Sequence, residues 1–173
     1  AGPAASELTQ CITKYSREII ASETIPVFSS EQSKGTLIET ASLPLWQNLV
    51  ISSRDKHGID YRDLCERAGT MDDLAIVIDA VHGASRLHIR ELLGAAAKSL
   101  VMLRGEADVS FGGIAPEPST ANMQGVVERL SGIDQKLKIG AIIDPDGDRI
   151  RFTDGKTEIS MNQFGAMAYH FLH

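Results

Sequence analysis

Three aspartates lie within five residues in the segment Asp144-Pro145-Asp146-Gly147-Asp148-Arg149. They directly follow the apolar run 139–143, which is typical of a buried strand, so they occupy the loop where that strand ends. Two carboxylates ~5 Å apart repel by roughly 3 kcal/mol at an effective dielectric of about 20, so a trio is costly without a cation. Hard oxygen ligands suit Mg²⁺ or Ca²⁺ better than zinc. The sequence therefore predicts a metal site at Asp144, Asp146 and Asp148, with a solvated acidic turn as the alternative.

Two other classes of acidic loop share part of this pattern. An EF-hand loop needs Gly at its sixth position and Glu at its twelfth, where this chain has Arg149 and Gly155. Phosphatases of the haloacid-dehalogenase type also carry Asp-x-Asp after an apolar strand, but Thr or Val is usual where Asp148 stands. A Mg²⁺-dependent phosphatase with Asp144 as nucleophile stays open as an alternative, as does a cation-binding domain without chemistry.

Composition narrows the class of protein. The chain has 173 residues, of which 43% are hydrophobic and 23% charged, as expected for one globular domain or a domain with an appendage. The net charge of −6 and the lack of a basic cluster argue against nucleic acid as partner. No apolar run approaches the ~20 residues that span a bilayer, so we expect no membrane partner. Cys11 and Cys65 lack any partner spacing and are predicted to be buried free thiols, which favours the cytoplasm.

The elements that must position the acids follow from periodicity. The apolar pattern predicts helices over 4–20, 41–56, 60–68, 84–96 and 120–131, strands over 74–79, 99–103, 139–143, 149–153 and 157–159, and a polar linker over 29–35. A last helix is predicted after a capping box of Ser160 and Gln163, with Phe164, Met167, Ala168 and Phe171 in a core stripe. Alternating strands and helices predict a three-layer α/β/α sandwich with a mostly parallel, mixed sheet. Such sheets bind ligands at the carboxyl ends of their strands.

The acidic segment resembles the metal loop of the α-D-phosphohexomutase family, which reads Asp-x-Asp-Gly-Asp-Arg, without a mismatch. Three further segments are similar to the family in the same order: 2–9 to the end of its first domain, 76–84 to the opening strand and turn of its second, and 111–118 to the stretch before the metal loop. The resemblance implies the second domain (36–173) of a four-domain enzyme, preceded by a first-domain tail and linker (1–35).

This resemblance also implies a reaction. Family members interconvert hexose 1-phosphate and hexose 6-phosphate through a phosphoserine and a bisphosphate intermediate. By this mapping Asp144, Asp146 and Asp148 hold Mg²⁺ together with a phosphoserine oxygen. Arg149 binds the phosphorylated substrate, with a salt bridge to its neighbouring aspartates as the alternative role. The implied partners are a hexose phosphate and the domains missing from this chain.

The nucleophile of that reaction is not found in this sequence. Thr40-Ala41-Ser42 resembles the start of the family's serine loop but lacks the His-Asn pair, so Ser42 is predicted as the N-cap of the following helix. The chain begins at Ala1 without Met and ends at His173 inside an apolar-periodic segment. We therefore expect an excised part of a phosphoglucomutase/phosphomannomutase-type enzyme that is inactive alone. Which hexose phosphate the enzyme uses stays open.

Overall fold

The computed structural model describes residues 4–22 and 38–173, and the chain divides into two compact units, Ala1–Thr40 and Ala41–His173. In the first unit, α1 (Ser6–Ala21) confirms the predicted first helix, while the linker predicted over 29–35 lies outside the described residues. Cys11 on α1 is exposed, so the prediction of a buried thiol there is wrong. The reason is that α1 has no buried residue on either face.

The second unit is built on one sheet with the strand order β2-β1-β3-β4-β5 among the described residues. The strands are β1 (Leu74–Asp79), β2 (Leu100–Leu103), β3 (Leu137–Ile143), β4 (Ile150–Thr153) and β5 (Glu158–Ile159). β1 pairs in parallel with β2 and β3, and β4 and β5 continue the sheet antiparallel. The predicted mostly parallel, mixed sheet is confirmed.

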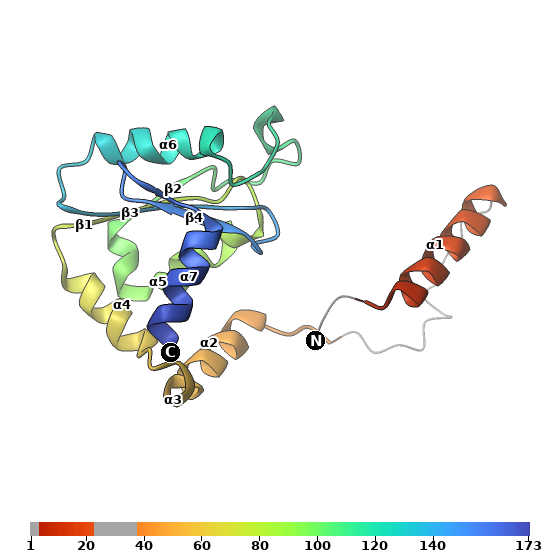
Figure 1. Ribbon diagram of the computed structural model, residues 1–173, viewed down its shortest axis with the longest axis horizontal. Coiled ribbons are helices and arrows are strands. Elements are labelled where there is room, and N and C mark those ends of the chain that lie inside the picture. Colours follow the sequence, from red (N-terminus) through yellow and green to blue (C-terminus); the bar gives the residue numbers. More distant parts are fainter. Residues whose placement is uncertain (1–3, 23–37) are drawn as a thin grey trace. The chain divides into compact units, whose positions relative to one another are not determined.

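One face of the sheet is covered by α6 (Thr120–Ser131), the helix predicted over 120–131 (Figure 1). Met123, Val126 and Leu130 of this helix are fully buried and pack against Val77 and Ile142 of the central strands. Tight packing here depends on a missing side chain. A Cβ at Gly140 would lie 2.6–2.8 Å from Val126, Thr153 and Leu130.

The opposite face is covered by α4 (Tyr61–Thr70), by a series of short helices after β1 and, beside β4, by α7 (Met161–Leu172), which completes the α/β/α layering (Figure 1). The hydrophobic core on this face of the sheet contains Leu74, Ile76 and Leu100 from the strands. The short helices are η1 (Ala84–Leu87), α5 (Ile89–Leu93) and η2 (Gly94–Ser99). The continuous helix predicted over 84–96 is therefore wrong, because His88 (φ −120°) and Gly94 (φ +52°, ψ −123°) leave helical geometry.

The helix predicted over 41–56 is divided into α2 (Ser42–Ser52) and α3 (Arg54–His57), which ends at the left-handed Gly58. Ala41 occupies the N-cap position of α2 and Ser42 is its first helical residue, so the predicted Ser42 cap is wrong. The helix entry lacks a side-chain cap because Ala41 has no polar group to offer.

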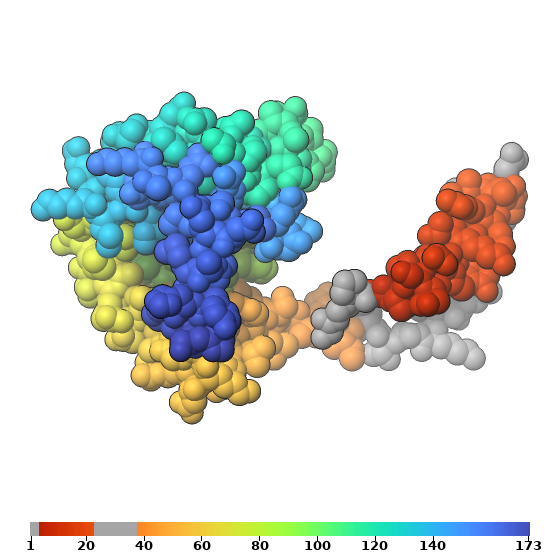
Figure 2. All heavy atoms as spheres, viewed as in Figure 1, coloured from red at the N-terminus to blue at the C-terminus, as the bar shows by residue number. Residues whose placement is uncertain are grey.

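The last helix, α7, starts with the predicted capping box, in which Ser160 and Gln163 satisfy each other's backbone N–H groups. Phe164 packs on Phe152 of β4 with ring centroids 4.8 Å apart. The predicted core stripe is nevertheless wrong, because Met167 is 56% and Phe171 is 72% exposed. Figure 2 shows α7 on the surface of this unit with its outer side uncovered. The structure shows α7 in contact with β4, a strand of four residues.

A helix that crosses a bilayer must be both long and apolar. None of the helices within 4–22 and 38–173 combines both properties.

Candidate metal centre

The acidic segment 144–149, here called the Asp loop, leaves the carboxyl end of β3 and leads into β4. The loop is closed by a hydrogen bond from the Asp144 N–H to the Arg149 carbonyl, with N···O 3.2 Å. Gly147 makes the turn with φ +81°, a left-handed conformation that favours glycine. This closure brings alternate side chains to one side of the loop.

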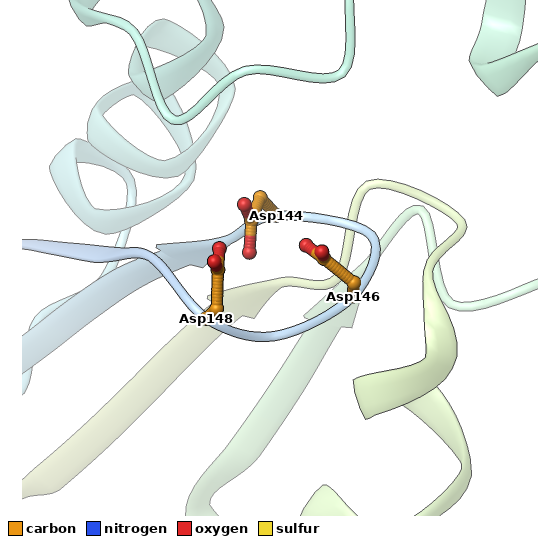
Figure 3. A group of neighbouring side chains, drawn as sticks. All are labelled: Asp144, Asp146 and Asp148. Atoms are coloured by element: carbon orange, nitrogen blue, oxygen red, sulfur yellow. The ribbon is translucent and has the colours of Figure 1, made fainter. Parts of the chain in front are cut away.

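The side chains of Asp144, Asp146 and Asp148 point toward one another (Figure 3). One carboxylate oxygen of each lies within 4.8 Å of those of the other two, so the predicted convergence of the three acids is present in the structure. Asp144 is completely buried, whereas Asp146 and Asp148 are exposed. Such an arrangement of one inner and two outer carboxylates could hold a metal ion, and hard oxygen donors suit Mg²⁺.

Asp144 is held by hydrogen bonds on both carboxylate oxygens. Its Oδ1 accepts from the backbone N–H groups of Gly147 and Arg149, each at 3.1 Å, and its Oδ2 accepts from Arg149 Nε at 2.7 Å. Burial alone would raise the pKa of the Asp144 carboxyl, but the backbone and guanidinium bonds from Arg149 outweigh it and the pKa falls below its usual range. Asp144 is therefore ionised and oriented before any ligand arrives.

Asp148 has the opposite electrostatic environment. A hydrogen bond to the Asp144 carboxyl, followed by the charge of Asp146, raises the pKa of Asp148 above its ordinary value. A raised pKa means that the third negative charge is disfavoured by the first two. A divalent cation among these oxygens would remove that repulsion, so the electrostatics of the residues fit a metal ion.

Arg149 contacts three carboxylates. Besides Asp144, its guanidinium pairs with Glu117 and lies 3.5 Å from Asp148. The hydrogen bond to Glu117, and then that to Asp144, raises the pKa of Arg149 above its ordinary value. The salt-bridge role considered for Arg149 is thus present in the structure, while its contact with a substrate phosphate stays a prediction.

Glu117 is a residue of this centre that sequence reasoning did not assign to it. It lies between Pro116 and Pro118, and its carbonyl accepts a hydrogen bond of 2.7 Å from Asn122 Nδ2 on α6. A charged residue held between two prolines has little freedom, and that local rigidity was the available signal. Its pairing with Arg149, 32 residues away, could not be found from sequence spacing.

A second ion pair lies under the loops at the same edge of the sheet. Asp79 ends β1 and is buried, and its carboxylate accepts from Arg104, which follows β2, at 2.8 Å (Nε–Oδ1) and 2.6 Å (Nη2–Oδ2). The sequence placed Asp79 at a strand end, a common position for functional residues in such sheets, but assigned it no role. The structure uses it to join the turns that follow β1 and β2.

Comparison with known families identifies the class of protein to which this fold and centre belong. Residues 60–157, more than half of the chain, match the family model described as phosphoglucomutase/phosphomannomutase, alpha/beta/alpha domain II. The chain therefore belongs to the phosphoglucomutase/phosphomannomutase family, as the Asp loop predicted.

Solved structures with similarity to the chain are named as phosphomannomutase, phosphoglucomutase or a member of the joint family. A phosphomannomutase candidate from Thermus thermophilus is 20% identical over 61% of this chain and 25% of its own, with a TM-score of 0.48. A phosphoglucomutase/phosphomannomutase family protein from Burkholderia thailandensis is 28% identical over 57% of this chain and 22% of its own, with a TM-score of 0.44.

The open form of the exocytosis-sensitive phosphoprotein pp63/parafusin, a phosphoglucomutase from Paramecium, is 20% identical over 65% of this chain and 20% of its own, with a TM-score of 0.48. The chain thus spans a quarter or less of the length of these relatives. A search of the curated proteins gives no match.

Proposed function

We propose that this chain supplies the metal centre of a phosphohexomutase that interconverts hexose 1-phosphate and hexose 6-phosphate through a phosphoserine and a bisphosphate intermediate. The observation that supports this proposal is the convergence of Asp144, Asp146 and Asp148 at the carboxyl end of β3 in a chain of this family. The phosphoserine and the groups that select the sugar would come from other domains. The chain by itself would then be inactive, and the cytoplasm is its proposed location.

Each acid would have a distinct part in holding Mg²⁺. Asp144 is ionised and locked by Arg149, so it can meet a cation without rearranging. Asp146 and Asp148 are exposed and can move toward an ion that enters from solvent together with other ligands. A bound divalent cation would withdraw charge from a phosphoryl group during its transfer.

Arg149 would orient the phosphorylated sugar. A guanidinium presents donors in a planar fork that matches phosphoryl oxygens. Glu117 is exposed and shares this guanidinium, so an arriving phosphate dianion can compete with Glu117 for it while Asp144 remains bound to Nε. The chain would in this way keep Arg149 oriented until substrate enters.

A phosphatase with Asp144 as nucleophile fits the geometry less well. A nucleophilic carboxylate must bring a free lone pair to the phosphorus atom, so it has to be accessible to a substrate that arrives from solvent. Asp144 is 0% exposed, so a substrate phosphorus cannot reach its carboxylate, whereas an ion held by the exposed Asp146 and Asp148 could still meet the second lone pair of Oδ2, which accepts one hydrogen bond. These contacts favour a role as metal ligand.

Titration calorimetry with Mn²⁺ and Mg²⁺ tests the metal centre. We expect weak binding by the wild-type chain and at least a tenfold loss in Asp146→Asn and Asp148→Asn, because each removes one charged oxygen ligand. Asp72→Asn is the matched control, since Asp72 is 98% exposed and pairs only with Lys98 among the contacts that the structure describes for it. Absence of binding, or equal binding by Asp146→Asn, would overturn the proposed centre.

Activity assays separate the competing functions. With Mg²⁺, we expect the isolated chain neither to convert glucose or mannose 1-phosphate nor to release phosphate from an aryl phosphate. Phosphate release that Asp144→Asn abolishes would establish the phosphatase instead. In an intact enzyme containing this chain, Asp146→Asn should abolish mutase turnover, whereas a cation-binding domain without chemistry predicts no turnover even in the wild type.

A further inference from the structure

The turn after β1 touches the Asp loop at a glycine. Gly83 faces the backbone of Pro145, the residue between the metal-ligand candidates Asp144 and Asp146. A Cβ at position 83 would lie 2.4 Å from the Pro145 Cα and 2.7 Å from its carbonyl oxygen, closer than real Cβ contacts. The next residue, Ala84, donates its N–H to the same carbonyl at 2.8 Å. Contact and hydrogen bond together determine where Pro145 can lie.

This turn is held in an unusual backbone conformation. Val81 and His82 have left-handed φ angles of 46° and 58°, which is rare for a β-branched residue such as Val81. The Val81 N–H donates to Asp79 Oδ1 at 2.9 Å, and the His82 N–H donates to the Arg104 carbonyl at 2.8 Å. Strain of this kind persists only where surrounding bonds over-determine the backbone, and here the ion pair between the buried Asp79 and the partly buried Arg104 does so.

We propose that Gly83 is a positioning residue for the Asp loop, and this inference rests on the proposed metal centre. Arg149 anchors Asp144 on one side of Pro145, while Gly83 and the Ala84 N–H limit Pro145 on the other. The spacing between Asp144 and Asp146 then depends on how closely the turn approaches. Metal-ligand distances tolerate only about 0.2 Å, so a side chain that displaces Pro145 disrupts the ligand set.

The test compares the Mn²⁺ affinities of the wild-type 173-residue chain and its variants. Electron paramagnetic resonance measures the concentration of free Mn²⁺ in each titration. Gly83→Ala pushes Pro145 away, and we expect about a 10- to 100-fold weaker affinity, as for other groups that orient metal ligands. Gly165→Ala is the matched control, because a Cβ there meets nothing within 4 Å. Its affinity should equal that of the wild type. All titrations are made where circular dichroism shows the variant to be folded, so that a general loss of stability does not contribute.

A second variant reaches the same contact through the hydrogen bond. Ala84→Pro removes the donor to Pro145 at the first position of η1, and the preceding Gly83 (φ −80°, ψ −176°) already has the extended backbone that proline requires. If Gly83→Ala fails to fold, the Mn²⁺ affinity of Ala84→Pro tests the positioning role in its place. Wild-type chain that binds no Mn²⁺ would overturn the metal centre itself. The positioning role alone is overturned if the wild-type chain binds Mn²⁺ and both variants bind it with an affinity within about twofold of the wild-type value. In that case the amide resonances of Asp146 and Gly147 would also be unshifted in the variants.

Discussion

Arg149 holds Asp144 by both carboxylate oxygens, through its backbone N–H to Oδ1 at 3.1 Å and through Nε to Oδ2 at 2.7 Å. The Asp144 N–H returns a hydrogen bond to the Arg149 carbonyl. Two residues at the ends of the Asp loop thus close it and neutralise a fully buried charge. Arg149, which we expect to bind the phosphorylated substrate, is therefore also required for the shape of the loop.

Substituting Arg149 should lower stability in the absence of metal. Arg149→Ala leaves the buried Asp144 without its cation, but Arg149 is 39% exposed and its pairing is partly screened. We expect the melting temperature to fall by about 2–4 °C, measured by calorimetry with a chelator present. Mg²⁺ should recover part of this loss, because it neutralises the same carboxylate.

Arg149→Lys is the control for that prediction. It keeps the positive charge but lacks the planar fork, so its melting temperature should lie between those of wild type and Arg149→Ala. Equal melting of all three proteins would mean that the backbone N–H groups alone stabilise Asp144.

Substituting Asp148 should have the opposite effect on the metal-free chain. Its pKa is raised in the folded state, so the folded chain disfavours ionised Asp148 at neutral pH and Asp148→Asn removes that cost. We expect a small rise in melting temperature at about pH 7, together with loss of Mn²⁺ binding.

The pH dependence of this gain checks its cause. As pH falls through the raised pKa of Asp148, the wild-type carboxyl becomes protonated and resembles Asn, so the difference in melting temperature should shrink. A difference that grows in acid would show that the substitution acts through something other than charge.

Packing beneath α6 gives a prediction independent of metal. A Cβ at Gly140 would meet Val126, Thr153 and Leu130 at 2.6–2.8 Å, so Gly140→Ala overpacks the core. We expect a loss of about 1–3 kcal/mol in the free energy of unfolding, measured in urea. Gly165→Ala, in an open position on α7, should instead be neutral or stabilising by up to about 1 kcal/mol, since alanine favours a helix. Equal effects of the two substitutions would contradict the close packing at Gly140.

The two cysteines should differ in reactivity. Cys11 is exposed, whereas Cys65 is half-buried, and burial raises the pKa of the Cys65 thiol. Because the thiolate is the reacting form, Cys65 should be labelled more slowly than Cys11 at about pH 7.5 and should accelerate as pH rises. Labelling rates with a disulfide reagent in Cys11→Ser and Cys65→Ser variants check this. Faster labelling of Cys65 would mean that α4 opens readily.

Several helices and strands of the fold could be predicted from local sequence. The apolar runs at 74–79 and 139–143 predicted β1 and β3, and Ser160 with Gln163 predicted the start of α7. These features depend on neighbours within a few residues, where side-chain periodicity and capping act directly. The helix predicted over 84–96 was wrong because its apolar pattern continues through Gly94, whose φ of +52° and ψ of −123° end α5.

The sequence by itself determined the acidic loop, its place after a buried strand and the family to which these residues point. Only the tertiary structure decided that Gly83 meets Pro145, that Glu117 reaches Arg149 and that α7 leaves its apolar side uncovered. The physical reason is that the two contacts join residues tens of positions apart, and that the exposure of α7 depends on which elements pack against it. Both are properties of strand order and packing that local periodicity does not contain.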